Sequence, residues 1–175
     1  MLNKKLINFS LFYTVGILAL SYTIASPILI EISKSVSSEV SDMGLLYTLF
    51  FTGFVLGSFL GGMLSKRLSK MHILNTSLIF HTIFIIIFSF SKNYIFALIS
   101  SLTIGITGGL NEIMACTLLA ELNKGREGYY MNISQMFFGI GAFIGPYISS
   151  TVIKFGLNWS SAYYIVAFLA FIVLS

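Results

Sequence analysis

The chain has 175 residues, of which 57% are hydrophobic and only 9% are charged, and its mean hydropathy is +0.93. Soluble domains carry about 25% charged residues, so ten Lys and Arg with six Asp and Glu cannot cover a water-facing globule. The composition therefore excludes a cytosolic enzyme, a nucleic-acid-binding protein and a disordered chain, and it predicts a polytopic membrane protein. At about 20 apolar residues for each span, the length holds about six helices.

The charged residues divide the chain into six apolar runs, which we expect to be membrane-spanning helices. In chain order the runs are 7–30, 43–64, 73–91, 94–120, 129–153 and 160–175, and we expect them to form one domain, 1–175. The last run is short and has no cationic residue after it, so it is expected to be truncated.

Lys and Arg are distributed unevenly between the two ends of these runs. With a cytoplasmic N-terminus, seven of the ten lie in cytoplasmic segments and three lie outside. This bias follows the positive-inside rule. It predicts an integral protein of the cell (plasma) membrane with both ends of the chain in the cytoplasm.

Two of the runs carry glycines at helical spacing. They are Gly53, Gly57 and Gly61 in the second run, and Gly141 and Gly145 in the fifth. Stripes of small residues let two helix backbones approach closely in lipid, so generic packing and a transporter-specific role are both open. Their corresponding places in two sets of three helices indicate an inverted repeat, which is a transporter trait. Pro146 follows the second stripe and is expected to kink its helix.

Glu112 is the one charged residue that lies well inside a run. It is about 7 Å from the centre of the 94–120 helix, where an acidic side chain costs about 2.5–3.5 kcal/mol on insertion scales. It should therefore face a cavity or a partner. Two interpretations remain open: a carboxyl that loads and unloads a proton, or a neutral carboxyl hydrogen-bonded for helix packing.

Other polar residues are expected in the same layer of the membrane. Asn111 adjoins Glu112, and Asn132 and Gln135 stand near the cytoplasmic end of the fifth run, so all four are candidate substrate-binding residues. His81 lies near the centre of the third run. It is a candidate proton relay beside Glu112 or, alternatively, a hydrogen-bonded structural residue.

Several chemical motifs are missing from the sequence. It has no phosphate-binding glycine loop, no His, Cys and Asp cluster with metal-ligand spacing, and no Ser-His-Asp arrangement. We therefore expect no enzymatic activity, no cofactor and no metal, and we expect any transport to use an ion gradient or the gradient of the substrate.

The loop after the second run resembles the signature between helices two and three of the major facilitator superfamily, Gly-x-Leu-(small)-Asp-Arg-x-Gly-Arg. The candidate gating residues in this loop are Gly62, Lys66, Arg67 and Lys70. Lys66 stands where the signature has an acidic residue, and Ser69 stands where it has glycine.

A second resemblance, to the fucose permease-like branch of this superfamily, rests on residues 108–112, 120–123, 132–142 and 145–146. By this resemblance Glu112 matches a fourth-helix glutamate linked to proton coupling, and Asn132 and Gln135 match polar positions of helix five. The acidic residue of helix one in fucose permease is replaced near residues 26–27, so fucose as substrate is not implied.

The resemblance implies an all-α membrane protein, with six transmembrane helices arranged as two inverted three-helix repeats, that is, the N-terminal half of a major facilitator fold. It implies secondary transport of a small solute, sugar-like or another metabolite, by proton-coupled symport with alternating access. The implied partners are a small-molecule substrate, protons, the lipid bilayer, and a second six-helix half or a second copy of the chain. The glycine stripes would pack against helices of that second half.

Two other functions remain open. Gly141, Gly145 and Pro146 also resemble the helix-five signature of drug:proton antiporters, which predicts efflux of a drug or metabolite instead of uptake. A function from another class is a non-transporting fragment or partner subunit that needs a second half.

Overall fold

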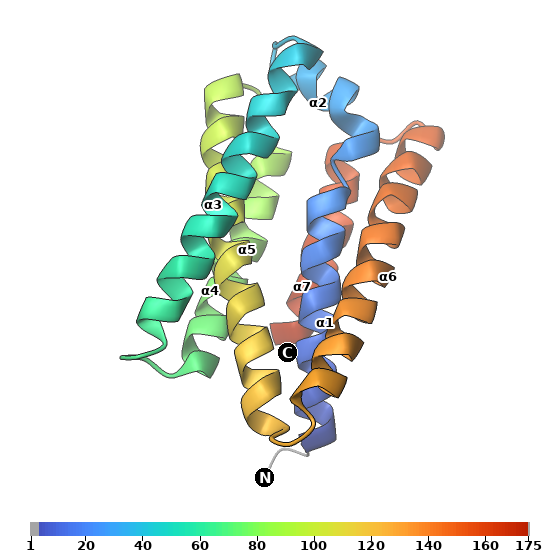
Figure 1. The fold of residues 1–175 in the computed structure, drawn as a ribbon. Coiled ribbons are helices and arrows are strands. Elements are labelled where there is room, and N and C mark those ends of the chain that lie inside the picture. Colours follow the sequence, from blue (N-terminus) through green and yellow to red (C-terminus); the bar gives the residue numbers. More distant parts are fainter. Residues whose placement is uncertain (1–3, 175) are drawn as a thin grey trace.

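The computed structural model describes residues 4–174, and the side chains of residues 4–172. Within this range the chain is all helical (Figure 1). The long helices are α1 (Lys4–Thr23), α3 (Met43–Leu64), α4 (Lys70–Ser89), α5 (Tyr94–Leu122), α6 (Glu127–Lys154) and α7 (Ser160–Leu174). Between α1 and α3 lie the short elements η1 (Ser26–Ile28), α2 (Leu29–Ser35) and η2 (Val40–Asp42).

Local sequence signals account for several of the helix ends. The Ser69 side chain accepts a hydrogen bond from the His72 N–H at 3.1 Å and so caps α4, and Asn93 caps α5 by accepting from the Ile95 N–H at 2.9 Å. Both are preferred N-cap residues. After α6 the chain turns at Gly156, whose φ of 71° favours glycine.

The predicted runs agree with the long helices within a few residues, except the first. The sequence predicts one helix over 7–30, whereas α1 ends at Thr23 and the chain resumes as η1 and then as α2, which ends at Ser35. Pro27 lies at the start of η1. Proline cannot donate a backbone hydrogen bond and disfavours helical geometry in the residue before it, which accounts for the interruption. Pro146, in contrast, lies inside the continuous α6.

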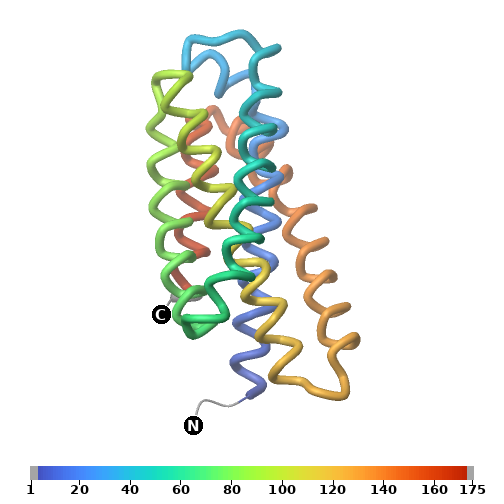
Figure 2. Tube along the Cα trace, turned by 60° about the vertical axis from the view of Figure 1, so that its left-hand side comes forward, coloured from blue at the N-terminus to red at the C-terminus, as the bar shows by residue number. Residues whose placement is uncertain are grey.

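The bundle consists of two inverted repeats, α1–α3–α4 and α5–α6–α7. The second repeat begins at the opposite end of the bundle from the first, as the chain path shows (Figures 1 and 2). In this symmetry α1 corresponds to α5, α3 to α6 and α4 to α7. The contact of α3 with α5 therefore corresponds to the contact of α6 with α1, and the contact of α4 with α5 corresponds to that of α7 with α1. These four helix pairs therefore follow the internal symmetry.

The glycine stripes lie where helices cross at two positions related by this symmetry, α3 over α5 and α6 over α1. A side chain at Gly53 or Gly57 would collide with the backbone of α5 at Leu102 and Ile106, and a side chain at Gly141 would collide with the backbone of α1 at Gly16. The expectation that these stripes pack against helices of a second half is therefore wrong. They bring the helices of this chain together, α3 on α5 and α6 on α1.

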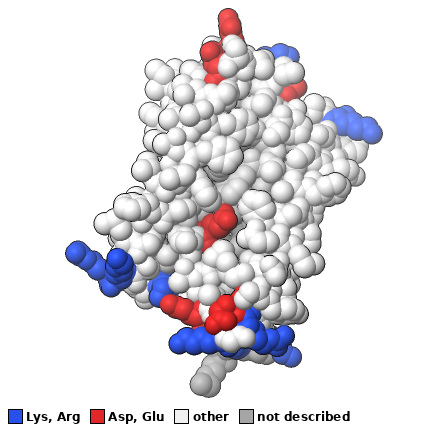
Figure 3. Space-filling view, viewed as in Figure 1, with Lys and Arg blue, Asp and Glu red and all other residues white. Residues whose placement is uncertain are grey.

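The surface of the bundle suits a bilayer. Five helical segments of the described part are long and apolar enough to cross a membrane, and α7 is a shorter apolar helix. Large apolar side chains such as Val55, Phe59 and Phe143 are exposed. Lys, Arg, Asp and Glu gather mostly at the two ends of the visible face, and a wide band that is uncharged except for one acidic group separates them (Figure 3).

An apolar groove of about 980 Å³ lies between α1, α4 and the C-terminal end of α7. Its walls include exposed Phe9, Ile79 and Ile83. Such a surface is suited to contact with hydrocarbon rather than with a polar solute.

Candidate functional site: a carboxyl in the middle of the bundle

Glu112 lies on α5, ten residues before the end of the helix at Leu122. The residue is half-buried, and its Oε2 atom is buried without a hydrogen-bond partner among the described residues. Figure 3 shows one acidic group in a hollow within the uncharged band of the visible face. A carboxyl at this depth should have a partner or access to water, because an unpaired buried carboxyl is costly.

Tyr22 of α1 approaches α5 one helical turn before Glu112. At Gly108 an added Cβ would lie only 2.7 Å from the Tyr22 hydroxyl, so the phenol occupies the space that the glycine leaves free. The Tyr22 hydroxyl is itself buried without a hydrogen-bond partner among the described residues. Its ring packs against Phe50 and Phe54 of α3, with ring centroids at 4.9 and 5.8 Å.

Asn111 points in a different direction from its neighbour Glu112. It is fully buried, and its Oδ1 atom accepts a hydrogen bond from the Ser77 hydroxyl of α4 at 2.5 Å. Its Nδ2 group has no partner among the described residues. The structure therefore places Asn111 in the α4–α5 contact, and not on the surface that Glu112 reaches.

His81 connects three helices. It is fully buried on α4, with Nε2 at 3.2 Å from the Ser21 hydroxyl of α1 and Nδ1 at 3.0 Å from the Thr107 hydroxyl of α5. A neutral imidazole has one donor and one acceptor nitrogen, so these two contacts satisfy the ring. A relay role for His81 would require one nitrogen to leave its hydroxyl.

Asn132 and Gln135 lie on the outer face of α6. Both are exposed, whereas Ser134 between them is fully buried. Phe138 continues the Gln135 face one turn further along, and its ring lies 6.4 Å from the ring of Tyr22. The exposed amides therefore lie on a helix face that leads to the aromatic side chains beside Glu112.

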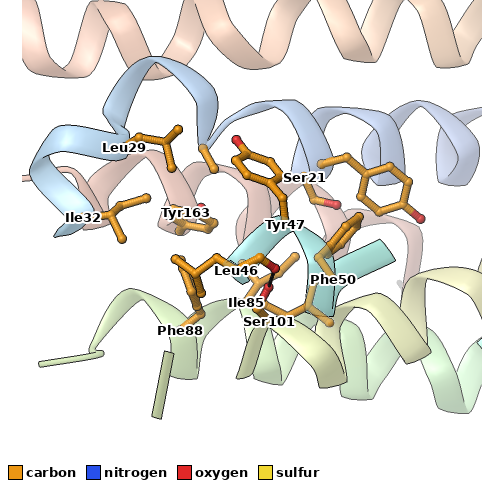
Figure 4. Close-up of a pocket in the computed structure, with 13 residues that line it drawn as sticks. Ser21, Leu29, Ile32, Leu46, Tyr47, Phe50, Ile85, Phe88, Ser101 and Tyr163 are labelled. Atoms are coloured by element: carbon orange, nitrogen blue, oxygen red, sulfur yellow. Dashed lines mark hydrogen bonds between the residues drawn. The ribbon is translucent and has the colours of Figure 1, made fainter. Parts of the chain in front are cut away.

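A small cavity of about 50 Å³ lies on the other side of the Tyr22 ring, towards η1 and α2. Figure 4 shows its lining, in which Ser21 and Ser101 supply hydroxyls among aromatic side chains such as Tyr47 and Tyr163. Pockets for small-molecule ligands measure about 300–1,000 Å³, whereas a water needs about 10–15 Å³. The cavity has room for a few waters and not for a sugar ring.

The candidate gating loop connects α3 and α4. Lys66 and Arg67 are exposed, and Gly62 has open space around it. Lys70 begins α4 and forms an ion pair with Glu121 of α5, with Nζ and Oε1 2.8 Å apart. Glu121 lies in a stretch that carries the family resemblance, but no role is predicted for it from the sequence.

Tyr22 was not identified from the sequence either. It is one of nine Tyr and 17 Phe residues, and its spacing does not distinguish it from them. Among the residues that the structure describes, no group of three or more His, Cys, Asp and Glu side chains is arranged to hold a metal ion.

The family model described as Major Facilitator Superfamily matches residues 11–175. No curated protein matches the chain.

Proposed function

The chain belongs to the major facilitator superfamily, and we propose that it forms one half of a proton-coupled secondary transporter of a small solute. The family consists of membrane transporters, so the chain is an integral, multi-pass membrane protein with a role in transport.

The observation that carries the proposal is the environment of the Glu112 carboxyl. A carboxyl kept for packing would have both oxygens hydrogen-bonded, as most buried polar atoms are. Instead Oε2 has no partner among the described residues, and the side chain is half-buried. This arrangement favours a group that exchanges a proton over a group that holds two helices together.

The substrate would bind on the surface that carries Glu112 and the exposed amides of Asn132 and Gln135. Amides donate and accept hydrogen bonds, and aromatic rings such as Phe138 stack on apolar ring faces. This combination suits a small, uncharged, hydroxyl-rich solute such as a sugar. Asn111 would join the site only after releasing Ser77, so we propose that it acts in the substrate-bound arrangement.

A second six-helix half, or a second copy of the chain, would complete the site. Alternating access would then follow from rocking of the two halves around a site near the middle of the membrane. The exposed loop with Lys66 and Arg67 would open and close the cytoplasmic side. In this scheme Glu112 carries the proton and His81 holds α1, α4 and α5 in place.

The test uses proteoliposomes that contain the chain, alone and with a co-expressed second half. A panel of uncharged solutes is added under an imposed pH gradient, and accumulation and the pH of the medium are recorded. We expect Glu112→Gln to lose pH-driven accumulation but to keep exchange of the solute. Glu127→Gln, at the exposed start of α6, is the matched control and should behave as the wild type.

Three results would contradict the proposal. Full accumulation by Glu112→Gln would remove the coupling role of that residue. Acidification of the medium during solute uptake would indicate proton antiport, as in drug efflux. Absence of flux for every solute, even with the second half present, would indicate a non-transporting subunit.

A further inference from the structure

We propose that Tyr22 is the hydrogen-bond partner of Glu112, and that its hydroxyl donates to the carboxylate whenever Glu112 is ionised. The inference rests on the proposed function, because it concerns the same carboxyl. It makes Tyr22 a positioning residue that connects the charge of Glu112 to the packing of the neighbouring helices.

The first argument is the complementarity of two buried atoms. The Tyr22 hydroxyl can donate a hydrogen bond, and the Glu112 Oε2 atom can accept one, yet both lack partners among the described residues. An unsatisfied buried polar group is costly, so pairing the two atoms removes two such costs at once.

The second argument is their position along α5. The Tyr22 hydroxyl lies against Gly108, and Glu112 is four residues further on, which is about 6 Å along the axis and on the same face of the helix. In the proposed pair, a rotation of the flexible Glu112 side chain or one bridging water would join the two groups.

The third argument is the absence of another suitable partner on the packed helices. The charged and titratable side chains in the described parts of these helices, tyrosines apart, lie mostly near the ends: Lys4 and Lys5 of α1, Lys70 and His72 of α4, Glu121 of α5, and Glu127 and Lys154 of α6. The helix α3 has none. In the middle, both His81 nitrogens have partners, and Cys116, one turn after Glu112, is only a weak donor.

The packing of the Tyr22 ring connects the Tyr22–Glu112 pair to neighbouring helices. The ring contacts Phe50 and Phe54 of α3 and Phe138 of α6, so it joins three helices at one point. Phe138 lies on the α6 face that carries Gln135. Protonation of Glu112 would weaken the hydrogen bond from the Tyr22 hydroxyl, because a neutral carboxyl is a poorer acceptor than a carboxylate. The weaker bond would allow the ring to move against the helix that carries the substrate amides.

The test is infrared spectroscopy of the full-length chain in lipid vesicles, with the carboxyl bands of Glu112 assigned by their loss in Glu112→Gln. The readout is the ratio of carboxylic acid to carboxylate at a fixed pH. In Tyr22→Phe, which keeps the ring and removes the donor, we expect this ratio to rise about tenfold, the equivalent of about 1.4 kcal/mol.

Two further variants separate the hydrogen bond from general packing. Gly108→Ala adds a methyl group against the Tyr22 hydroxyl and should change the ratio in the same direction as Tyr22→Phe. Tyr47→Phe is the matched control, because that hydroxyl bonds to Ser26 at 3.1 Å, and it should leave the ratio unchanged.

An unchanged ratio in Tyr22→Phe, with the Glu112 band still present, would overturn the inference and leave the proposed function intact. Full accumulation by Glu112→Gln would instead contradict the proposed function, whatever the spectra of the Tyr22 variant show. The two failures are therefore distinguishable.

Discussion

The side-chain amides of Asn8 and Asn123 hydrogen-bond to each other in both directions, with Nδ2–Oδ1 distances of 3.1 and 3.0 Å. Asn8 lies in the second turn of α1 and Asn123 is the C-cap of α5, so the pair joins the first helices of the two repeats. Both residues are buried. Asn123 also donates to the Leu119 carbonyl at 2.8 Å and so satisfies part of the end of α5.

Removal of either amide should destabilise the protein. Asn8→Ala leaves the Asn123 Oδ1 atom without the donor it has in Asn8, and we expect a loss of about 1–3 kcal/mol. The double variant should lose less than the sum of the single losses, with a coupling of about 0.6–1.7 kcal/mol, as for hydrogen bonds between membrane helices. Unfolding can be followed with a thiol-reactive dye on Cys116, the single cysteine. Asn75→Ala, at an exposed residue, is the control. Strictly additive losses for the Asn8 and Asn123 variants would refute the interaction between the two amides.

Gly57 and Gly62 should respond to alanine in opposite ways. At Gly57 the added Cβ would meet the Ile106 backbone, whereas at Gly62 it would meet nothing within 4 Å. Gly57→Ala should therefore separate α3 from α5 and cost about 1–3 kcal/mol. Gly62→Ala should be neutral or stabilise the helix by about 0.5–1 kcal/mol. Equal melting temperatures for the two variants would show that α3 does not pack on α5 through Gly57.

His81→Leu tests whether the imidazole is structural. The Ser21 hydroxyl also lies 2.7 Å from the Leu18 carbonyl, and the Thr107 hydroxyl lies 3.0 Å from the Thr103 carbonyl. Each hydroxyl can therefore donate to a carbonyl when the ring is removed. We expect a stability loss of about 1–3 kcal/mol for two lost hydrogen bonds, with pH-driven accumulation retained. Loss of accumulation in a normally folded variant would instead support the proton relay.

The orientation in the membrane can be measured with single cysteines in a Cys116→Ser background. Leu68→Cys lies in the exposed loop between α3 and α4, and Ser41→Cys lies in η2 at the opposite end of the bundle. With a cytoplasmic N-terminus, a membrane-impermeant thiol reagent should label only Ser41→Cys on intact cells. Labelling of Leu68→Cys before permeabilisation would reverse the proposed orientation.

The helix positions follow from the sequence because so few residues are charged. The ends of the 43–64 run coincide with the ends of α3, since Asp42 and Lys66 stand close to each end of an uninterrupted apolar segment. The first span was less predictable. Apolar residues continue beyond Pro27, so the hydropathy gives no sign of a helix end. Pro27 nevertheless lacks the backbone N–H that a continuous helix needs at this position.

The partners of individual residues were much harder to predict. Helical spacing places Gly53 and Gly57 on one stripe, but it does not say which helix the stripe meets, and that helix is α5 of the same chain. Asn111 and Glu112 adjoin in sequence, yet successive residues on a helix point about 100° apart, so one faces α4 and the other faces away from it. The approach of Tyr22 to Gly108 depends on how α1 crosses α5, which no local pattern encodes.

The glycine crossings also determine which parts of the bundle can move. The helices α3 and α5, and likewise α6 and α1, meet backbone to backbone at glycines. If one helix slid along its partner, larger side chains would replace the glycines and collide with the partner's backbone carbonyls. We therefore expect each pair to move as one unit, so that a change of shape within the bundle would be a hinge motion between the two pairs. Glu112 belongs to one pair and Tyr22 to the other. The protonation state of Glu112 would therefore change how tightly the two pairs are held together.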